Sequence, residues 1–148
     1  MTIVDLTLAL VIAAALLAAT AAVGLLLRRG QGRVRAVDSA ESIDPRTLGT
    51  GPLGENATLL QFSTELCSLC PGVHRLLSAV ADERTGVRHL DVDLTHRPDL
   101  AQRFRVLQTP TTLVLDRTGT IRTRIAGAPT RAVVETELDR LHEEAPHV

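Results

Sequence analysis

Aromatic side chains are almost absent from this sequence. It has no Trp and no Tyr, and its two Phe residues make up 1% of a 148-residue chain whose apolar fraction is 45%. A folded domain must therefore build its core mainly from Leu, Val and Ala. One soluble domain with an accessory segment is the organisation that this length favours.

Net charge and cysteine are also scarce. The formal net charge is −1, so no overall positive field indicates a nucleic-acid partner. Cys67 and Cys70 are the only cysteines, and one pair three residues apart cannot form a framework of structural disulfides. The lack of other cysteines does not identify the redox compartment.

One long stretch, from Leu6 to Leu27, contains no charged residue and consists mainly of Ala, Leu, Val and Ile. At about 1.5 Å per residue, a helix of this length crosses a hydrocarbon core about 30 Å thick. We therefore expect residues 1–28 to form a transmembrane anchor. A cleaved signal peptide is the alternative, but the run is longer than an ordinary signal core and no Lys or Arg precedes it.

The charges on either side of this stretch predict its orientation. Asp5 is the only charged side chain before it, and arginines follow it. The positive-inside bias therefore predicts a cytoplasmic domain on a single-pass anchor, with an extracytoplasmic domain as the alternative. Membrane lipid is the expected contact of these arginines. The arginines are Arg28, Arg29, Arg33 and Arg35.

The remainder of the chain divides into three parts. Residues 29–55 are rich in Arg, Gly and Pro and are expected to be a linker, with a short packed turn near residues 43–48. Residues 56–144 carry the expected folded domain, and residues 145–148 form a tail. Small residues spaced four apart in the anchor leave open an integral membrane partner, although an anchor without a partner is the simpler interpretation.

Strand and helix patterns alternate within the expected domain. The strand–helix–strand order predicts a parallel pair with a right-handed crossover, and a later hairpin adds antiparallel strands. The result is an α/β fold with a central mixed sheet flanked by helices. Strands are predicted at residues 58–62, 87–93, 111–115 and 120–125, and helices at residues 70–84, from Pro98 onward, and at residues 130–142.

Cys67 and Cys70 lie where the first of these strands meets the first of these helices. Two thiols with C-x-x-C spacing can close a disulfide without a large backbone movement. The helix N-terminus favours the reactive thiolate form. We therefore predict a redox-active dithiol. Two inert buried thiols are one alternative, and a zinc site that includes His74 is another, but zinc lacks a fourth ligand here and we expect no metal.

This order of elements, with C-x-x-C after the first strand and Thr109-Pro110 before the hairpin, resembles the thioredoxin family. The resemblance covers residues 58–141, nearly all of the expected domain, and implies a thioredoxin-like fold. It implies that Cys67 is the nucleophile, that Cys70 resolves the mixed disulfide, and that no cofactor other than this disulfide is needed. It also implies a cis Pro110 beside the dithiol, with Thr109 binding a substrate peptide.

The sequence departs from the family at several positions. The family's Trp before the first cysteine is Leu66 here. The buried acid of the family falls at Gln61, which cannot ionise, and its lysine companion falls at His89. Candidates for proton transfer or for tuning the thiol pKa are Gln61, Glu65, His74 and His89.

Two hypotheses about function follow. The first is a membrane-tethered thiol–disulfide oxidoreductase, with disulfide-containing proteins or low-molecular-weight thiols as substrates and a separate electron donor or acceptor. The second is a thioredoxin-like docking subunit of a membrane complex, with little or no redox turnover. The fold alone does not decide between them.

Overall fold

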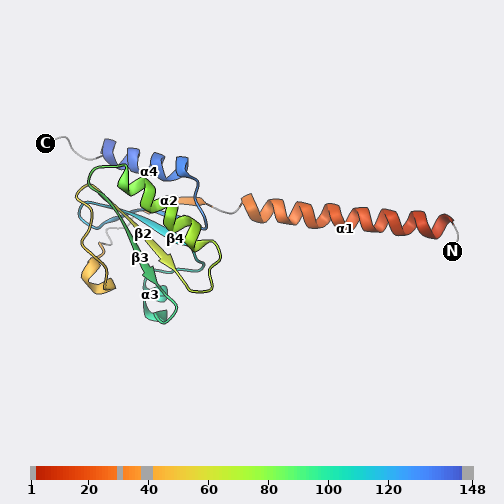
Figure 1. Ribbon diagram of the computed structural model, residues 1–148, viewed down its shortest axis with the longest axis horizontal. Helices are drawn as coiled ribbons and strands as arrows, with labels where there is room; N and C mark the ends of the chain where they lie inside the picture. Colours follow the sequence, from red (N-terminus) through yellow and green to blue (C-terminus); the bar gives the residue numbers. More distant parts are fainter. Residues whose placement is uncertain (1–2, 30–31, 38–41, 145–148) are drawn as a thin grey trace. The chain divides into compact units, whose positions relative to one another are not determined.

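The computed structural model describes residues 3–29, 32–37 and 42–144 (Figure 1). The chain separates into two compact units, Met1–Gln31 and Gly32–Val148, and we describe each by itself. The predicted tail, residues 145–148, lies outside the described residues, as do residues 30–31 and 38–41 of the predicted linker.

The first unit is a single helix, α1 (Ile3–Arg29), of 27 residues. Its segment Thr7–Leu26 is long and apolar enough to cross a membrane, and the protein buries none of it. An N-terminal signal sequence has the same properties. The helix is therefore either a membrane anchor or a signal sequence.

The second unit is built on a five-stranded mixed sheet in the order β1-β5-β4-β2-β3. The pair β2·β3 is parallel, as predicted, and the other neighbours are antiparallel. The strands are β1 (Arg33–Ala36), β2 (Ala57–Ser63), β3 (Val87–Asp93), β4 (Thr111–Asp116) and β5 (Ile121–Ala126).

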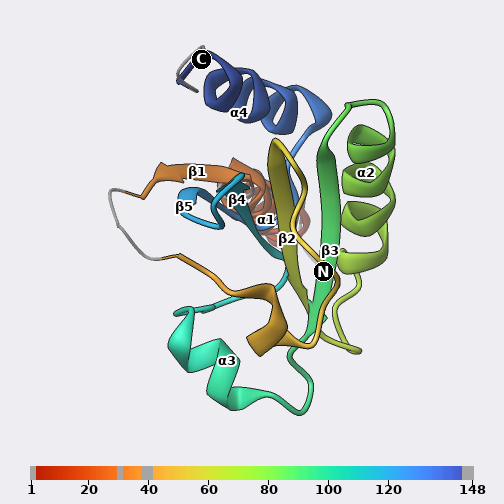
Figure 2. The same ribbon diagram turned by 90° about the vertical axis from the view of Figure 1, so that its left-hand side faces the viewer.

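Helices cover both faces of this sheet (Figure 2). The helices α2 (Cys70–Asp82) and α4 (Arg131–Glu144) pack on one face, and α3 (Pro98–Arg103) packs on the other. Pro71 lies in the first turn of α2, where its missing N–H costs nothing. Its buried residues Val73, Leu77 and Val80 recur at helical spacing and form the stripe that faces the sheet.

The two faces have different cores. On the α3 face, Phe62 and Phe104 stack with ring centroids 5.4 Å apart, beside the buried Ile43 and Leu48. The core under α2 and α4 contains only aliphatic side chains. Because successive residues of a strand point to opposite faces, Gln61 lies on this second face although its neighbour Phe62 lies on the first.

The segment predicted to be a linker contains a strand and a short 3-10 helix. A packed turn is present, because the 3-10 helix η1 (Pro45–Leu48) follows Ile43, and both Ile43 and Leu48 are buried in the core of the domain. In addition, β1 pairs with β5, so the folded unit begins at Gly32. All four side chains of β1 are exposed, and a strand without a buried face has no apolar periodicity that would predict it.

Candidate active site

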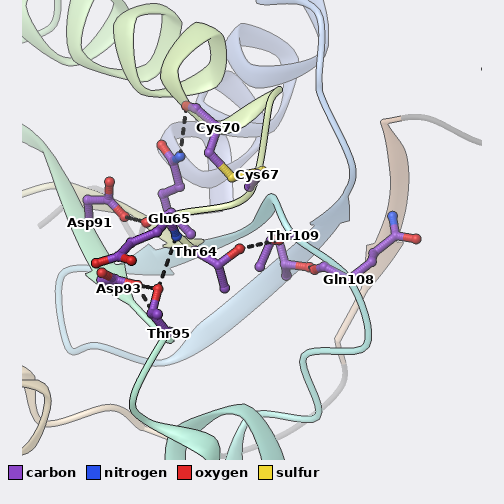
Figure 3. The surroundings of a disulfide bond; sticks show 12 residues. Thr64, Glu65, Cys67, Cys70, Asp91, Asp93, Thr95, Gln108 and Thr109 are labelled. Carbon is purple, nitrogen blue, oxygen red and sulfur yellow. Dashed lines mark hydrogen bonds between the residues drawn. A yellow bond between two sulfur atoms is a disulfide. The ribbon is translucent and has the colours of Figure 1, made fainter.

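Cys67 and Cys70 form a disulfide at the N-terminus of α2 (Figure 3), with an S–S distance of 2.07 Å and a Cα–Cα distance of 5.4 Å. They are therefore not the free buried thiols of the first alternative. Cys70 is only 5% exposed, whereas Cys67 is half-buried. Of the two cysteines, Cys67 is therefore the more accessible residue.

Short turns carry the chain from β2 into this disulfide. The N–H of Cys67 donates to the carbonyl of Thr64 at 3.1 Å, and the N–H of Cys70 donates to the carbonyl of Cys67 at 3.3 Å. The carbonyl of Ser63, the last residue of β2, accepts a hydrogen bond from the N–H of Leu94. The end of the sheet thereby holds the loop that carries Cys67.

The segment before β4 lies beside this loop. The Thr109–Pro110 bond is cis, as the resemblance implied, and Pro110 is buried. The Thr109 hydroxyl lies 3.2 Å from that of Thr64. Figure 3 marks this contact with a dashed line. The carbonyl of Pro110 accepts a hydrogen bond from the N–H of Gly127. Three loops from one end of the sheet are therefore bound to one another around the disulfide.

A shallow hollow of about 370 Å³ opens at the disulfide. Three carboxylates are among the residues that line it. Thr95 donates hydrogen bonds to Asp93 and lowers the pKa of that carboxyl, so Asp93 stays ionised at neutral pH. The lining residues are Ser63, Thr64, Glu65, Cys67, Cys70, Pro71, His74, Asp91 and Asp93.

A chain of polar side chains lies under the disulfide. Gln61 is 0% exposed, and its Nε2 donates to the carbonyl of Cys70 at 3.2 Å. Its Oε1 lies 3.2 Å from Nε2 of His89, and Nδ1 of His89 lies 2.9 Å from the hydroxyl of Ser78. An amide oxygen only accepts, so Nε2 of His89 must be the donor, and its Nδ1 then accepts from Ser78 in the neutral ring.

The environment of His89 keeps this ring neutral. Its pKa is lowered from 6.5 to about 4, first by burial and then by the nearby His74, while Asp91 partly offsets the shift. The rings of His74 and His89 lie edge to face, with centroids 4.7 Å apart. At neutral pH, Gln61 therefore donates a hydrogen bond to the main chain of Cys70, and the His89 ring that donates to Gln61 is uncharged.

The structure brings most of the predicted tuning residues together and separates one. Gln61, His89 and His74 form a connected group, whereas Glu65 is exposed at the rim and is held through its N–H, which donates to the hydroxyl of Thr95. Sequence reasoning missed Ser78. Its position four residues after His74 puts both on one side of α2, but only the placement of β3 reveals that His89 meets them.

A larger hollow, of about 530 Å³, lies at the opposite end of the sheet. It is lined in part by ion pairs such as Arg84 with Asp139 and Arg122 with Asp116. Neither cysteine lies there, so this hollow offers no thiol chemistry.

Comparisons with known proteins agree with this geometry. The thioredoxin family model matches residues 53–140, more than half of the chain. A search of curated protein sequences with this chain found no match.

Solved structures similar to the folded unit are also thioredoxins. Oxidised mitochondrial thioredoxin 3 from Saccharomyces cerevisiae is 21% identical, with a TM-score of 0.51 over 58% of this chain and 79% of that protein. The thioredoxin NaTrxh from Nicotiana alata is 23% identical, with a TM-score of 0.51 over 58% of this chain and 73% of that one. Thioredoxin-2, a component of the protein secretion machinery of the malaria parasite, is 20% identical, with a TM-score of 0.53 over 57% of this chain and 82% of that protein.

At these identities the solved structures show the fold alone, and the family model carries the assignment. The chain belongs to the thioredoxin family, and with its C-x-x-C disulfide it is a thiol–disulfide oxidoreductase.

Proposed function

We propose that this protein is a membrane-tethered oxidoreductase that reduces disulfides of proteins or small molecules, with Cys67 as the nucleophile and Cys70 as the resolving thiol. The observation that carries this proposal is the unequal exposure of the two cysteine residues, of which Cys67 is half-buried and Cys70 is buried. The accessible cysteine can reach a substrate, and the buried one can reach only its neighbour.

The reaction proceeds in two exchange steps. The thiolate of Cys67 attacks one sulfur of the substrate disulfide, the substrate S–S bond breaks, and the leaving sulfur takes a proton. The thiolate of Cys70 then attacks the sulfur of Cys67, which restores the disulfide and releases the second substrate thiol. Two electrons pass to the substrate, and an external dithiol donor must return them.

The neighbouring groups divide between binding and positioning. The main chain of Thr109 makes no hydrogen bond to another described residue, so it is available to an extended substrate segment beside Pro110. Gln61 and His89 position the main chain of Cys70. Because both nitrogens of His89 are already hydrogen-bonded, the proton of the Cys70 thiol passes to water or to the departing substrate sulfur.

Trapping tests this mechanism. The Cys70→Ser variant of the full chain should accumulate mixed disulfides through Cys67, because its resolving thiol is absent. Cys67→Ser is the matched control and should trap nothing. Turnover of an insulin disulfide by Cys67→Ser should be at least about a hundredfold lower than that of the unmodified chain.

A blank trap from correctly folded Cys70→Ser protein, together with no turnover in the unmodified chain, would support the alternative of a docking subunit. The uncharged Gln61 favours that alternative, because the resemblance implies an acid at this position.

We further propose that α1 is retained as a single-pass anchor over residues 1–28 and that the folded domain lies in the cytoplasm. The arginines that follow the apolar segment support this orientation. A membrane-impermeant thiol reagent, applied to intact cells after brief reduction with a permeant reagent, should leave Cys67 unlabelled. Labelling from outside would place the domain on the other side of the membrane.

A further inference from the structure

Arginines on the surface of the folded unit differ in how their charge is balanced. Some form ion pairs, as Arg84 does with Asp139 at 2.6 Å. Four exposed arginines form no ion pair with an acidic side chain of the described residues. We name these four and Arg124 the basic surface. The four are Arg33, Arg35, Arg103 and Arg105.

Strand register and one hydrogen bond gather the basic surface on the α3 face of the sheet. Arg35 is the register partner of Arg124, and register partners point to the same face. Nη2 of Arg124 donates to the carbonyl of Phe104, a core residue of the α3 face, at 2.7 Å. Arg33 lies two residues before Arg35 and points to the same face. The other two arginines directly precede and follow Phe104 in the chain.

The outer edge of β1 leaves main-chain groups without partners. This strand is the border of the sheet, as Figure 2 shows. The N–H of Val37 donates to the carbonyl of Arg122 on β5, and an antiparallel strand turns its main-chain groups to one neighbour at every second residue. Arg35 therefore also faces β5, and the N–H and C=O groups of Val34 and Ala36 face outward. No described residue bonds to these outward groups.

An extended segment of another protein can pair with such an edge. Its side chains then lie opposite those of β1. Arg33 and Arg35 point to the α3 face, whereas Val34, which is 40% exposed, points to the other face with its buried partner Ile125. The side chains that complement this pattern are two carboxylates at alternate positions with an apolar residue between them.

The basic surface is costly to the protein alone. Like charges directly opposite each other on paired strands are destabilising, and Arg35 and Arg124 are such a pair. A second copy of β1 would add further guanidinium groups, whereas a carboxylate offsets the repulsion. Charge therefore favours an acidic occupant over a second copy of this chain.

We propose that the outer edge of β1 and the basic surface bind an extended acidic segment of a partner protein, in which acidic residues alternate with apolar ones. The segment adds a strand to the sheet, and its carboxylates pair with the arginines. None of these residues lines the hollow at the disulfide, so the inference goes beyond the proposed function.

A synthetic peptide tests this inference. The probe is fluorescein-labelled Thr-Glu-Val-Glu-Val-Glu-Thr, and its fluorescence anisotropy is followed as the full chain is added in mild detergent. We expect saturable binding that weakens at least about tenfold between about 0.05 and 0.5 M NaCl. The control peptide, Glu-Glu-Val-Thr-Val-Thr-Glu, has the same composition but no two glutamates at alternate positions. It should bind at least about tenfold more weakly.

Variants separate strand pairing from simple attraction. Arg33→Gln/Arg35→Gln should weaken binding of the probe at least about tenfold. The matched control Arg75→Gln/Arg117→Gln removes the same charge from exposed positions elsewhere and should bind as the unmodified chain does. Ala36→Pro should abolish binding, because it removes an outward N–H at a position where an edge strand tolerates proline.

Hydrogen exchange locates the bound segment without any variant. Saturating probe should slow exchange of the Val34 and Ala36 amides in the unmodified chain at least about tenfold. Unprotected amides, equal binding of the two peptides, or equal losses in the two double variants would overturn the inference. An oligonucleotide of the same charge that binds as tightly as the probe would also overturn it, because it cannot add a strand. Insulin turnover is measured separately, so none of these outcomes bears on the proposed function.

Discussion

The two faces of the sheet are covered by cores of different composition, one with aromatic side chains and one without. The α3 face holds both phenylalanines and is sealed by apolar side chains. The α2 face, which carries the disulfide, is aliphatic but admits the buried polar residues Gln61 and Thr112. The α3 face is packed with apolar side chains. The α2 face also contains buried polar side chains, and one of them, Gln61, donates a hydrogen bond to the main chain of Cys70.

The largest expected effect comes from the aromatic face. Phe104→Ala removes half of the stacked pair and leaves a cavity, so the free energy of unfolding should fall by about 3–5 kcal/mol. Urea unfolding of the full chain in mild detergent measures this. The disulfide lies on the other face, so turnover per folded molecule should change little. A large loss of turnover in folded protein would show that the two faces are coupled.

A smaller effect is expected from acid on the polar face. The pKa of His89 is about 4 in the folded protein and 6.5 for the free side chain, so between these values the unfolded chain binds a proton that the folded chain does not. Stability should therefore be complete above pH 6.5 and should fall as the pH drops to 4. Because the ring is partly exposed, we expect a loss of about 2 kcal/mol.

The control for this prediction is His89→Gln, which cannot titrate. Urea unfolding at several pH values between 7 and 4 should show a flatter profile for this variant. His74 on α2 and Asp91 on β3 also act on the ring. An unchanged profile would assign the acid sensitivity to groups other than His89.

The smallest expected effect is at Thr112, the register partner of Gln61. Its side chain is 0% exposed, and its hydroxyl has no hydrogen-bond partner among the described residues. Thr112→Val removes this unpaired group at nearly constant volume, so stability should rise by about 1 kcal/mol. Thermal unfolding compares the two proteins, and a loss of stability would show that the hydroxyl is satisfied in solution.

Much of the α2 face could be predicted from the sequence, because its elements have strong local signals. The strand that ends before Cys67 and the helix that follows it were placed to within a residue or two, and the helix boundaries follow from Pro71 and the apolar spacing of Val73 and Leu77. The parallel pairing of β2 with β3 followed from the order of elements.

Contacts that depend on strand register could not be predicted in this way. Gln61 meets His89 only because β2 and β3 pair with Leu59 opposite His89. The edge strand β1 was missed for a different reason, since main-chain hydrogen bonds hold it and none of its side chains is buried. The assignment of Cys67 and Cys70 to separate catalytic steps came from the family resemblance and stays a prediction.

The exposed edge strand β1 also affects whether two copies of the domain can associate. Its outer side lies at the border of the sheet, where a second copy could add a strand of its own. Arg33 and Arg35 lie along that border, and an identical strand would bring four guanidinium groups together. Like charges therefore discourage pairing of two copies of the domain through their edge strands.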